Sequence, residues 1–241
     1  MILANSLIQG FFGSNFMGQV IVVLQLLGSV LMVAVIIGKS RELSFLAAAS
    51  RRFVNDFSTC RDVLEHYFNR RPSESAVGLE GMYARTCDRL LKLVAPDVRS
   101  LLAGHGSAED GVAALTSREI ELVKGACEHA LSEEILRVER GTGVVATVVA
   151  LSPMLGLLGT VWGVLDAFAE MGTAGSANLA TIAPSISSAL VTTVVGLLVA
   201  IPGVISFNHM NGTIRDMTSD MEGFADELIG RIACEFQGRG V

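Results

Sequence analysis

Hydroxyl side chains recur at helical spacing inside two long apolar segments of the sequence. Thr160 lies among glycines in "GLLGTVWG", while Thr193 and Ser188 lie in "SISSALVTTVVGL". A hydroxyl both donates and accepts hydrogen bonds, so several of them around a common interior would line a polar path. Thr160 and Thr193 both fall in the middle of their segments, and in an oligomer we expect them to face such an interior together with Ser188.

The same residues belong to stripes of small side chains, which supports a second interpretation. Small residues let membrane helices approach closely, and Ser or Thr hydroxyls can bond to carbonyls of their own helix, so packing alone is the alternative role. Steps of three and four residues place each stripe on one helix face. The packing face predicted in this way comprises Gly156, Gly163, Ser185, Ala189 and Gly196.

Neither segment contains an ionisable residue at depth. Asp166 lies near the end of the first segment, and no Lys, Arg, Asp or Glu occurs from Met171 to Ile214. Proton relays inside membranes normally need a titratable group. This chain therefore supplies a lining, and a partner must supply the proton carrier.

Other kinds of chemistry find no support in the sequence. The four cysteines form no C-x-x-C pair, and Cys127-Glu-His129 lacks the spacing of a metal site. "GLLGTVWG" has no lysine after its glycines, which a phosphate-binding loop requires. We find no nucleophile with a base and no basic-aromatic patch. The sequence predicts no enzyme activity, no metal, no cofactor and no nucleic-acid partner.

Charge-free stretches predict the elements that hold these hydroxyls. Of the 241 residues 51% are hydrophobic and 17% charged, and the mean hydropathy is +0.53. Met17 to Gly38 would reach about 33 Å as a helix, enough for a hydrocarbon core of about 30 Å. A signal peptide is the alternative for this first segment, but no positive region precedes it. We predict an all-α membrane protein with three transmembrane helices, whose long helices extend into a helical cytoplasmic domain.

Basic residues predict the orientation in the bilayer. Lys39 and Arg41 follow the first segment, and Arg137 and Arg140 precede the second, so the block between them is cytoplasmic by the positive-inside rule. The predicted order is a periplasmic N-terminus (1–16), transmembrane helix 1 (17–38), a cytoplasmic helical domain (39–141), transmembrane helix 2 (142–168), a periplasmic loop (169–181), transmembrane helix 3 (182–207) and a cytoplasmic tail (208–241).

The cytoplasmic block shows the apolar spacing of helices. One helix is expected to run on from the first span and to end at Arg71-Pro72, and another spans about Glu74 to Val94 and stops before Pro96. A third is expected to begin near Ser107 or at the capping box Thr116 to Glu119, and to run without interruption into the second membrane span.

Two quoted stretches resemble a known family. "SPMLGLLGTVWGVLDAF" (152–168) and "APSISSALVTTVVGLLVAIPGVISFN" (183–208) look like the paired signature of the MotA/TolQ/ExbB proton channel family. The three-span plan is similar to its TolQ and ExbB branch. The resemblance carries the two pore threonines of the family over to Thr160 and Thr193.

The resemblance also implies partners and a place in the cell. It implies a homo-pentamer in the lipid bilayer of the bacterial inner membrane, around a dimer of an ExbD- or TolR-like protein with one membrane helix and one aspartate. Proton motive force would then act on a TonB- or TolA-like protein. Ser188 stands where the TolQ and ExbB pattern "GIAEAL" has glutamate, which puts the proton path on the partner's aspartate.

Several alternatives stay open from sequence. A non-conducting scaffold of an envelope complex is the second reading of function. The TolQ role and the ExbB role share the quoted motifs, and sodium in place of protons is also open.

Overall fold

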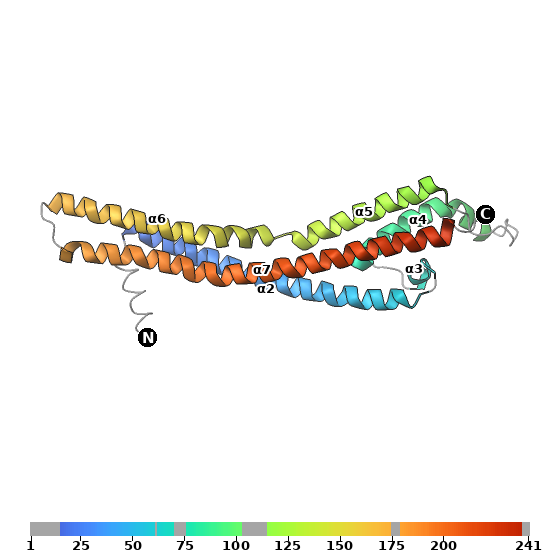
Figure 1. Cartoon of the computed structure of the whole chain (residues 1–241), viewed down its shortest axis with the longest axis horizontal. Coiled ribbons are helices and arrows are strands. Elements are labelled where there is room, and N and C mark those ends of the chain that lie inside the picture. The colour runs from blue at the N-terminus through green and yellow to red at the C-terminus, as the bar shows by residue number, and fades with distance from the viewer. Residues whose placement is uncertain (1–14, 61, 70–75, 103–114, 175–178, 238–241) are drawn as a thin grey trace. The chain divides into compact units, whose positions relative to one another are not determined.

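The chain is helical throughout the part that the structure describes. The computed structural model describes residues 15–60, 62–69, 76–102, 115–174 and 179–237, and no strand occurs within them. The helices are α2 (Phe16–Ser58), α3 (Glu65–Asn69), α4 (Leu79–Leu102), α5 (Ser117–Glu139), α6 (Thr142–Ala174) and α7 (Leu179–Gln237) (Figure 1). The predicted all-α class is therefore confirmed.

Three helical stretches are long and apolar enough to cross a membrane, as predicted. They lie within Phe16–Ser58, Ser117–Thr173 and Ile182–Phe236. Large apolar side chains point outward along them, for example Val30, Leu157 and Ile205, each more than half exposed. A soluble protein would bury such residues, whereas lipid accommodates them at no cost.

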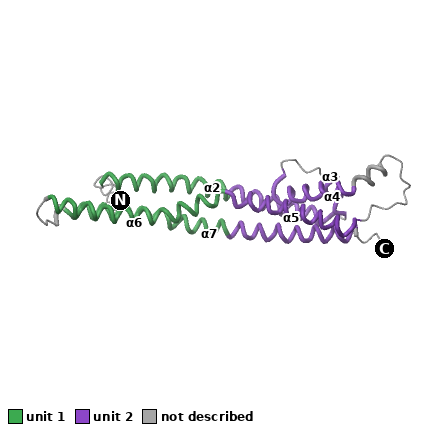
Figure 2. Tube along the Cα trace, turned by 90° about the horizontal axis from the view of Figure 1, so that it is seen from above, with its two compact units in different colours: residues 1–40, 141–211 green, residues 41–140, 212–241 purple. Residues whose placement is uncertain are grey.

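The chain divides into two compact units, and α2 and α7 contribute to both (Figure 2). The first unit comprises residues 1–40 and 141–211, and thus holds α6, the start of α2 and the first half of α7. Its helices approach at glycines: a Cβ added at Gly203 would lie 2.7 Å from Met32 Sδ and from Val149 Cγ2. Side-chain-free positions therefore set the helix spacing in this unit.

The second unit comprises residues 41–140 and 212–241 and has an aromatic core. Phe53, Phe57, Tyr83 and Phe224 are buried, and their ring centroids lie 5.2 to 6.0 Å apart in the pairs that touch. Tyr83 donates a 2.5 Å hydrogen bond to the carbonyl of Val63, which satisfies its buried hydroxyl.

A buried carboxylate ties three segments of this second unit together. Glu134 on α5 is 1% exposed and accepts a 2.9 Å hydrogen bond from the backbone N–H of Gly78. Its other oxygen pairs with Arg85 on α4 and lies 3.5 Å from Arg137. A buried charge of this kind is tolerated because it is paired and hydrogen-bonded.

Three of the predicted helices have wrong boundaries. α2 ends at Ser58 and not at Arg71, because the hydroxyls of Ser58 and Thr59 bond to the carbonyls of Asn55 and Asp56 and compete with the helical pattern. α4 begins at Leu79 and not near Glu74, because Gly78 has φ +69°, and it continues through Pro96 to Leu102, since a proline removes one helical hydrogen bond but keeps a helical φ.

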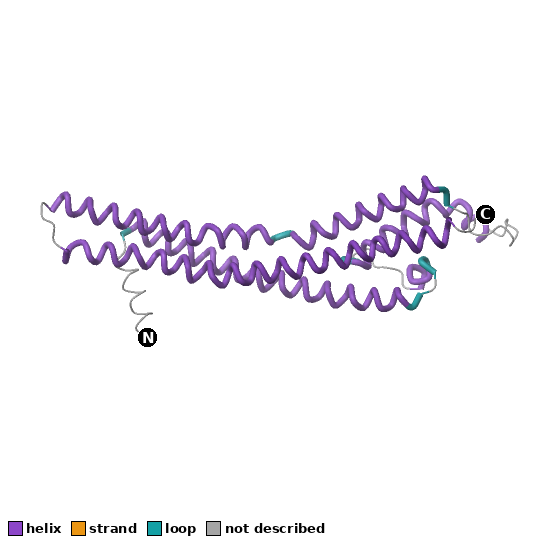
Figure 3. Tube along the Cα trace, in the orientation of Figure 1, coloured by secondary structure: helices purple, strands orange, loops and turns teal. Residues whose placement is uncertain are grey.

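The third correction concerns the helix expected to enter the second span without interruption. α5 ends at Glu139 and α6 begins at Thr142, and Figure 3 shows a short loop between them. Gly141 has φ +90°, a conformation that suits glycine and terminates helices. At the other end of α5, Thr116 forms the predicted capping box with Glu119; the alternative start at Ser107 lies outside the described residues.

Candidate functional site

α6 and α7 meet through bare backbone in the first unit. A Cβ added at Gly156 would lie 2.8 Å from Thr193 Cα, and one added at Gly163 would lie 2.5 Å from Ala189 Cβ. Such distances are shorter than real Cβ atoms tolerate, so both positions require glycine at this spacing. A Cβ at Gly196 would lie 2.5 Å from the Ser152 carbonyl oxygen, and the carbonyl of Ser185 lies 3.6 Å from the added Cβ of Gly163, so all five members of the predicted packing face lie at this contact.

Two threonine hydroxyls converge on one carbonyl at this contact. Thr193 Oγ1 donates a 2.8 Å hydrogen bond to the carbonyl of Gly156. Thr192 Oγ1 lies 3.2 Å from the same oxygen and 2.7 Å from the carbonyl of Ala189 in its own helix. Thr192 is 1% exposed, whereas Thr193 is half-buried. Thr193 therefore combines a bond between helices with an accessible surface.

Thr160 and Ser188 bond within their own helices. Thr160 Oγ1 donates to the carbonyl of Leu157 at 2.8 Å, and Ser188 Oγ donates to the carbonyl of Ser185 at 2.9 Å. Thr160 is half-buried and Ser188 is 5% exposed. A hydroxyl that donates to a carbonyl keeps its lone pairs as acceptors, so both oxygens can still receive a hydrogen bond.

Ser188 and Thr192 also border a small cavity. Its volume is about 10 Å³, close to the space that one water molecule needs. The lining residues are Asn15, Gly18, Gly159, Trp162, Gly163, Ser188, Ala189 and Thr192. Ser188 and Thr192 of α7 therefore line the same small cavity as Trp162 of α6.

The carboxylates of this unit lie toward the C-terminal part of α6. Asp166 accepts a 2.6 Å hydrogen bond from Asn15 Nδ2, and Glu170 accepts a 3.3 Å bond from Ser185. The Thr193–Gly156 contact lies on segments of α6 and α7 that carry no ionisable residue. The hydroxyls can thus exchange hydrogen bonds with water or with a protonated carboxyl group, but they do not ionise themselves.

A polar residue that the sequence analysis did not single out lies beside the same contact. Gln25 on α2 is 1% exposed, and its Nε2 donates a 3.0 Å hydrogen bond to the carbonyl of Ser152. An amide in the middle of an otherwise apolar span was the available signal.

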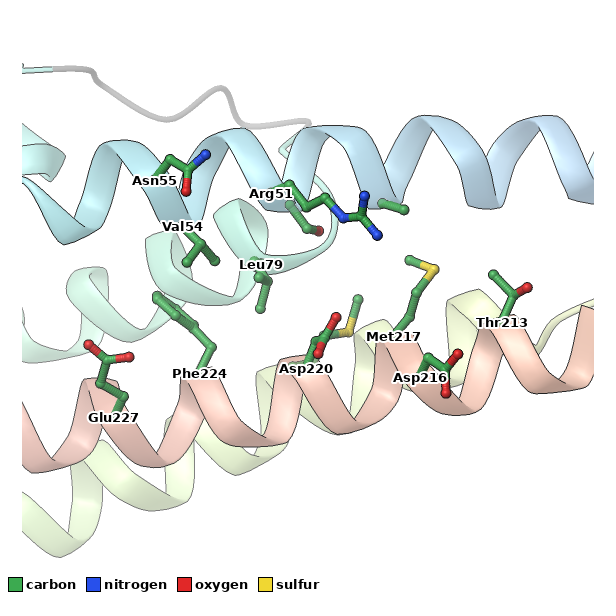
Figure 4. A pocket seen from close by; sticks show the side chains of 13 residues that line it. Arg51, Val54, Asn55, Leu79, Thr213, Asp216, Met217, Asp220, Phe224 and Glu227 are labelled. Carbon is green, nitrogen blue, oxygen red and sulfur yellow. The ribbon is translucent and has the colours of Figure 1, made fainter.

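The second unit contains the larger cavity, of about 680 Å³ (Figure 4). Arg51 on α2 and Asp216, Asp220 and Glu227 on α7 line it together with apolar residues such as Phe224. None of the predicted site residues belongs to it. Among the described residues, no group of three or more His, Cys, Asp or Glu side chains is placed to hold a metal ion.

Comparison with known proteins points to one family. Residues 101–223 match the family model described as the MotA/TolQ/ExbB proton channel family. The chain is 30% identical to the Tol-Pal system protein TolQ of Haemophilus influenzae over 223 aligned residues, and the aligned region covers 90% of each of the two chains. It is also similar to the biopolymer transport protein ExbB of Xanthomonas campestris pv. campestris (36% over 138 residues; 56% of this chain, 54% of the relative) and to TolQ of Pseudomonas aeruginosa (40% over 109 residues; 45% and 47%).

Proposed function

The chain belongs to the MotA/TolQ/ExbB proton channel family, and on that premise we propose that it is an inner-membrane channel subunit that converts proton motive force into mechanical work. It acts with an ExbD- or TolR-like partner on a TonB- or TolA-like protein, in outer-membrane transport or envelope maintenance. Its N-terminus faces the periplasm and its C-terminus the cytoplasm, in keeping with the cations that follow the first span and precede the second.

The observation that carries this proposal is the threonine pair on α6 and α7. Thr193 reaches the carbonyl of Gly156 and remains half-buried, and Thr160, which is also half-buried, lies one turn further along α6. In a homo-pentamer, five copies of each would surround a common interior. Their free lone pairs would then accept hydrogen bonds from water or from a protonated carboxyl group.

The partner would supply the titratable group. No Lys, Arg, Asp or Glu occurs in 141–165 or 171–214, and Ser188 takes the place of the family glutamate. A dimer of single-span subunits, each with one membrane aspartate, would complete the path. Each proton crossing about 100 mV releases roughly 2.3 kcal/mol, so several protons must cross for each step of useful work.

Proton flux in vesicles tests the proposal. The complex of this chain with its ExbD- or TolR-like partner is compared with Thr160→Ala and with the partner's aspartate changed to asparagine. Flux that falls in both variants, while the complex stays assembled, supports a shared pathway. Wild-type complex that assembles but passes no protons, with sodium tested in parallel, contradicts it.

A non-conducting scaffold is the second candidate, and one observation favours it. Thr160, Ser188 and Thr193 all donate to backbone carbonyls, as hydroxyls with a packing role alone would do. On that reading, Thr160→Ala or Thr193→Ala would disrupt assembly. The measured oligomeric state of each variant separates the two candidates.

A further inference from the structure

We infer that Gln25 is a positioning residue for the threonine site. Its amide holds α6 at Ser152, one turn before Gly156, and thereby fixes the position of the Gly156 carbonyl that accepts the hydrogen bond from Thr193. This inference rests on the proposed function for its effect on ion flux. The contact itself belongs to the first unit and is described without that assumption.

The amide of Gln25 is enclosed by all three long helices. Its Nε2 lies 3.0 Å from the carbonyl oxygen of Ser152 on α6, 127 residues later in the chain. Only 1% of Gln25 and 2% of Ser152 are exposed. This hydrogen bond therefore joins α2 to α6 away from solvent, where directional bonds hold helices in one register.

Gly196 on α7 makes room for this bond. A Cβ at that position would lie 2.5 Å from the Ser152 carbonyl oxygen and 2.8 Å from Gln25 Nε2. Even alanine would thus displace the donor or the acceptor. The glycine leaves the space in which the amide of α2 reaches the backbone of α6.

Gly156 links the amide to the threonine. A Cβ at Gly156 would lie 3.5 Å from Gln25 Nε2 and 2.8 Å from Thr193 Cα. The same turn of α6 is thus bounded by the amide of α2 on one side and by Thr193 on the other. Since glycine has no side chain to interlock, rotation of α6 at this level is resisted by hydrogen bonds, and any rotation would redirect the Gly156 carbonyl.

Stability alone does not account for the amide. Gln25 Oε1 is buried without a hydrogen-bond partner among the described residues, which disfavours the folded state. The reverse amide orientation would set Oε1 against the Ser152 carbonyl, so the donor must point to Ser152. A methionine of similar length would fill the space with no unpaired polar atom. A polar group kept at such a position in a membrane helix indicates a functional role.

The experiment compares proton flux in vesicles that contain the full complex with the partner. Gln25→Met removes the donor at nearly constant length, and Gly196→Ala displaces it from the other side. Each should lower flux roughly two- to tenfold, as expected for one hydrogen bond, with the complex still assembled. Leu24→Met, at an exposed apolar side chain on the same helix, and Gly143→Ala, where an added Cβ meets nothing within 4 Å, are the controls and should retain wild-type flux.

A combination of the two variants tests whether they act through one contact. If both act by breaking the Gln25–Ser152 bond, the double variant is no slower than the slower single variant. Full multiplication of the two effects would overturn the inference. So would unchanged flux in Gln25→Met when Thr193→Val lowers it.

Solid-state NMR supplies a readout that does not need ion flux. With ¹⁵N-labelled glutamine side chains and ¹³C-labelled serine and threonine, we expect a Gln–Ser carbonyl contact that disappears in Gln25→Met, together with a shift of the Thr193 Cβ resonance. An absent contact, or a Thr193 resonance that does not move, overturns the inference. If wild-type complex passes no protons, the proposed function fails, and these two signals still decide the role of Gln25.

Discussion

The hydroxyl of Thr193 donates a 2.8 Å hydrogen bond to the carbonyl of Gly156, 37 residues earlier in the chain. The bond joins α7 to α6 at a point where an added Cβ on Gly156 would meet Thr193 Cα at 2.8 Å. Close backbone approach and the hydroxyl bond therefore depend on each other. This coupling makes Thr193 both a packing residue and a member of the proposed path.

Replacement of Thr193 separates these two roles. Thr193→Val keeps the shape and removes the hydroxyl, so we expect proton flux to fall while the oligomer stays assembled. The loss of one hydrogen bond should lower the free energy of unfolding by about 0.5–1.5 kcal/mol. Flux in vesicles and the mass of the purified complex are the measurements.

Thr193→Ser is the control for this substitution. It keeps the hydroxyl and should retain most of the flux. If Thr193→Val dissociates the complex and Thr193→Ser does not, the hydroxyl serves assembly, and the scaffold reading gains support.

Substitution by alanine should affect stability differently at two glycines on α6. Gly163→Ala would place a Cβ 2.5 Å from Ala189 Cβ, so we expect overpacking to destabilise the α6–α7 contact by about 1–3 kcal/mol. The Cβ added by Gly172→Ala has no neighbour within 4 Å. Because alanine has the better helix propensity, this variant should leave stability unchanged or raise it by up to about 1 kcal/mol. Thermal unfolding of the two variants in detergent measures the difference, and equal effects would contradict the packing seen here.

The membrane helices were the most predictable part of the fold. Long stretches without charge can hardly form anything but spanning helices, because every backbone polar group in lipid must be bonded within its own segment. The capping box at Thr116 was equally predictable from sequence, since its two hydrogen bonds lie within four residues. Features fixed by local chemistry or by the solvent thus follow from sequence.

Contacts between distant segments were not predictable in the same way. Helical spacing places Thr193 and Gly156 on faces, but it does not give the register that joins them. Gln25 and Ser152 form a hydrogen bond although they are 127 residues apart, and no local sequence pattern predicts that pair. The break at Gly141 was different, because a glycine directly after Arg140 is an ordinary helix stop that the apolar pattern of the next span obscured.

The buried carboxylate of Glu134 should be important for the stability of the second unit. Glu134→Ala would leave the N–H of Gly78 and the guanidinium of Arg85 without their acceptor. Hydrogen bonds to charged groups contribute about 1.5–3 kcal/mol each, and because Arg85 is more than a third exposed we expect a total loss of roughly 2–3 kcal/mol. Denaturant unfolding is the measurement. Glu133→Ala, at a half-exposed side chain on the same helix, should change stability by less than about 0.5 kcal/mol.

Buried thiols should make the second unit sensitive to alkaline pH. Burial raises the pKa of Cys87 to about 12 and also raises the pKa of Cys127, whereas the pKa of a cysteine in the unfolded chain is about 8.5. The folded state therefore keeps its protons where the unfolded state has lost them. Its stability should be constant below pH of about 8.5 and fall as pH rises from there toward 12, by on the order of 1 kcal/mol per pH unit for each such thiol.

Cys87→Ala tests the origin of this alkaline loss. The variant should be less stable at neutral pH, because it leaves a small cavity, but its stability should fall less steeply above pH of about 8.5. Cys234→Ala is the control, since that thiol is exposed and should leave the slope unchanged. Unfolding free energies measured between pH 7 and 10 decide the point. A Cys87→Ala slope equal to that of the wild type would show that another group, such as the buried thiol of Cys127, dominates the alkaline response.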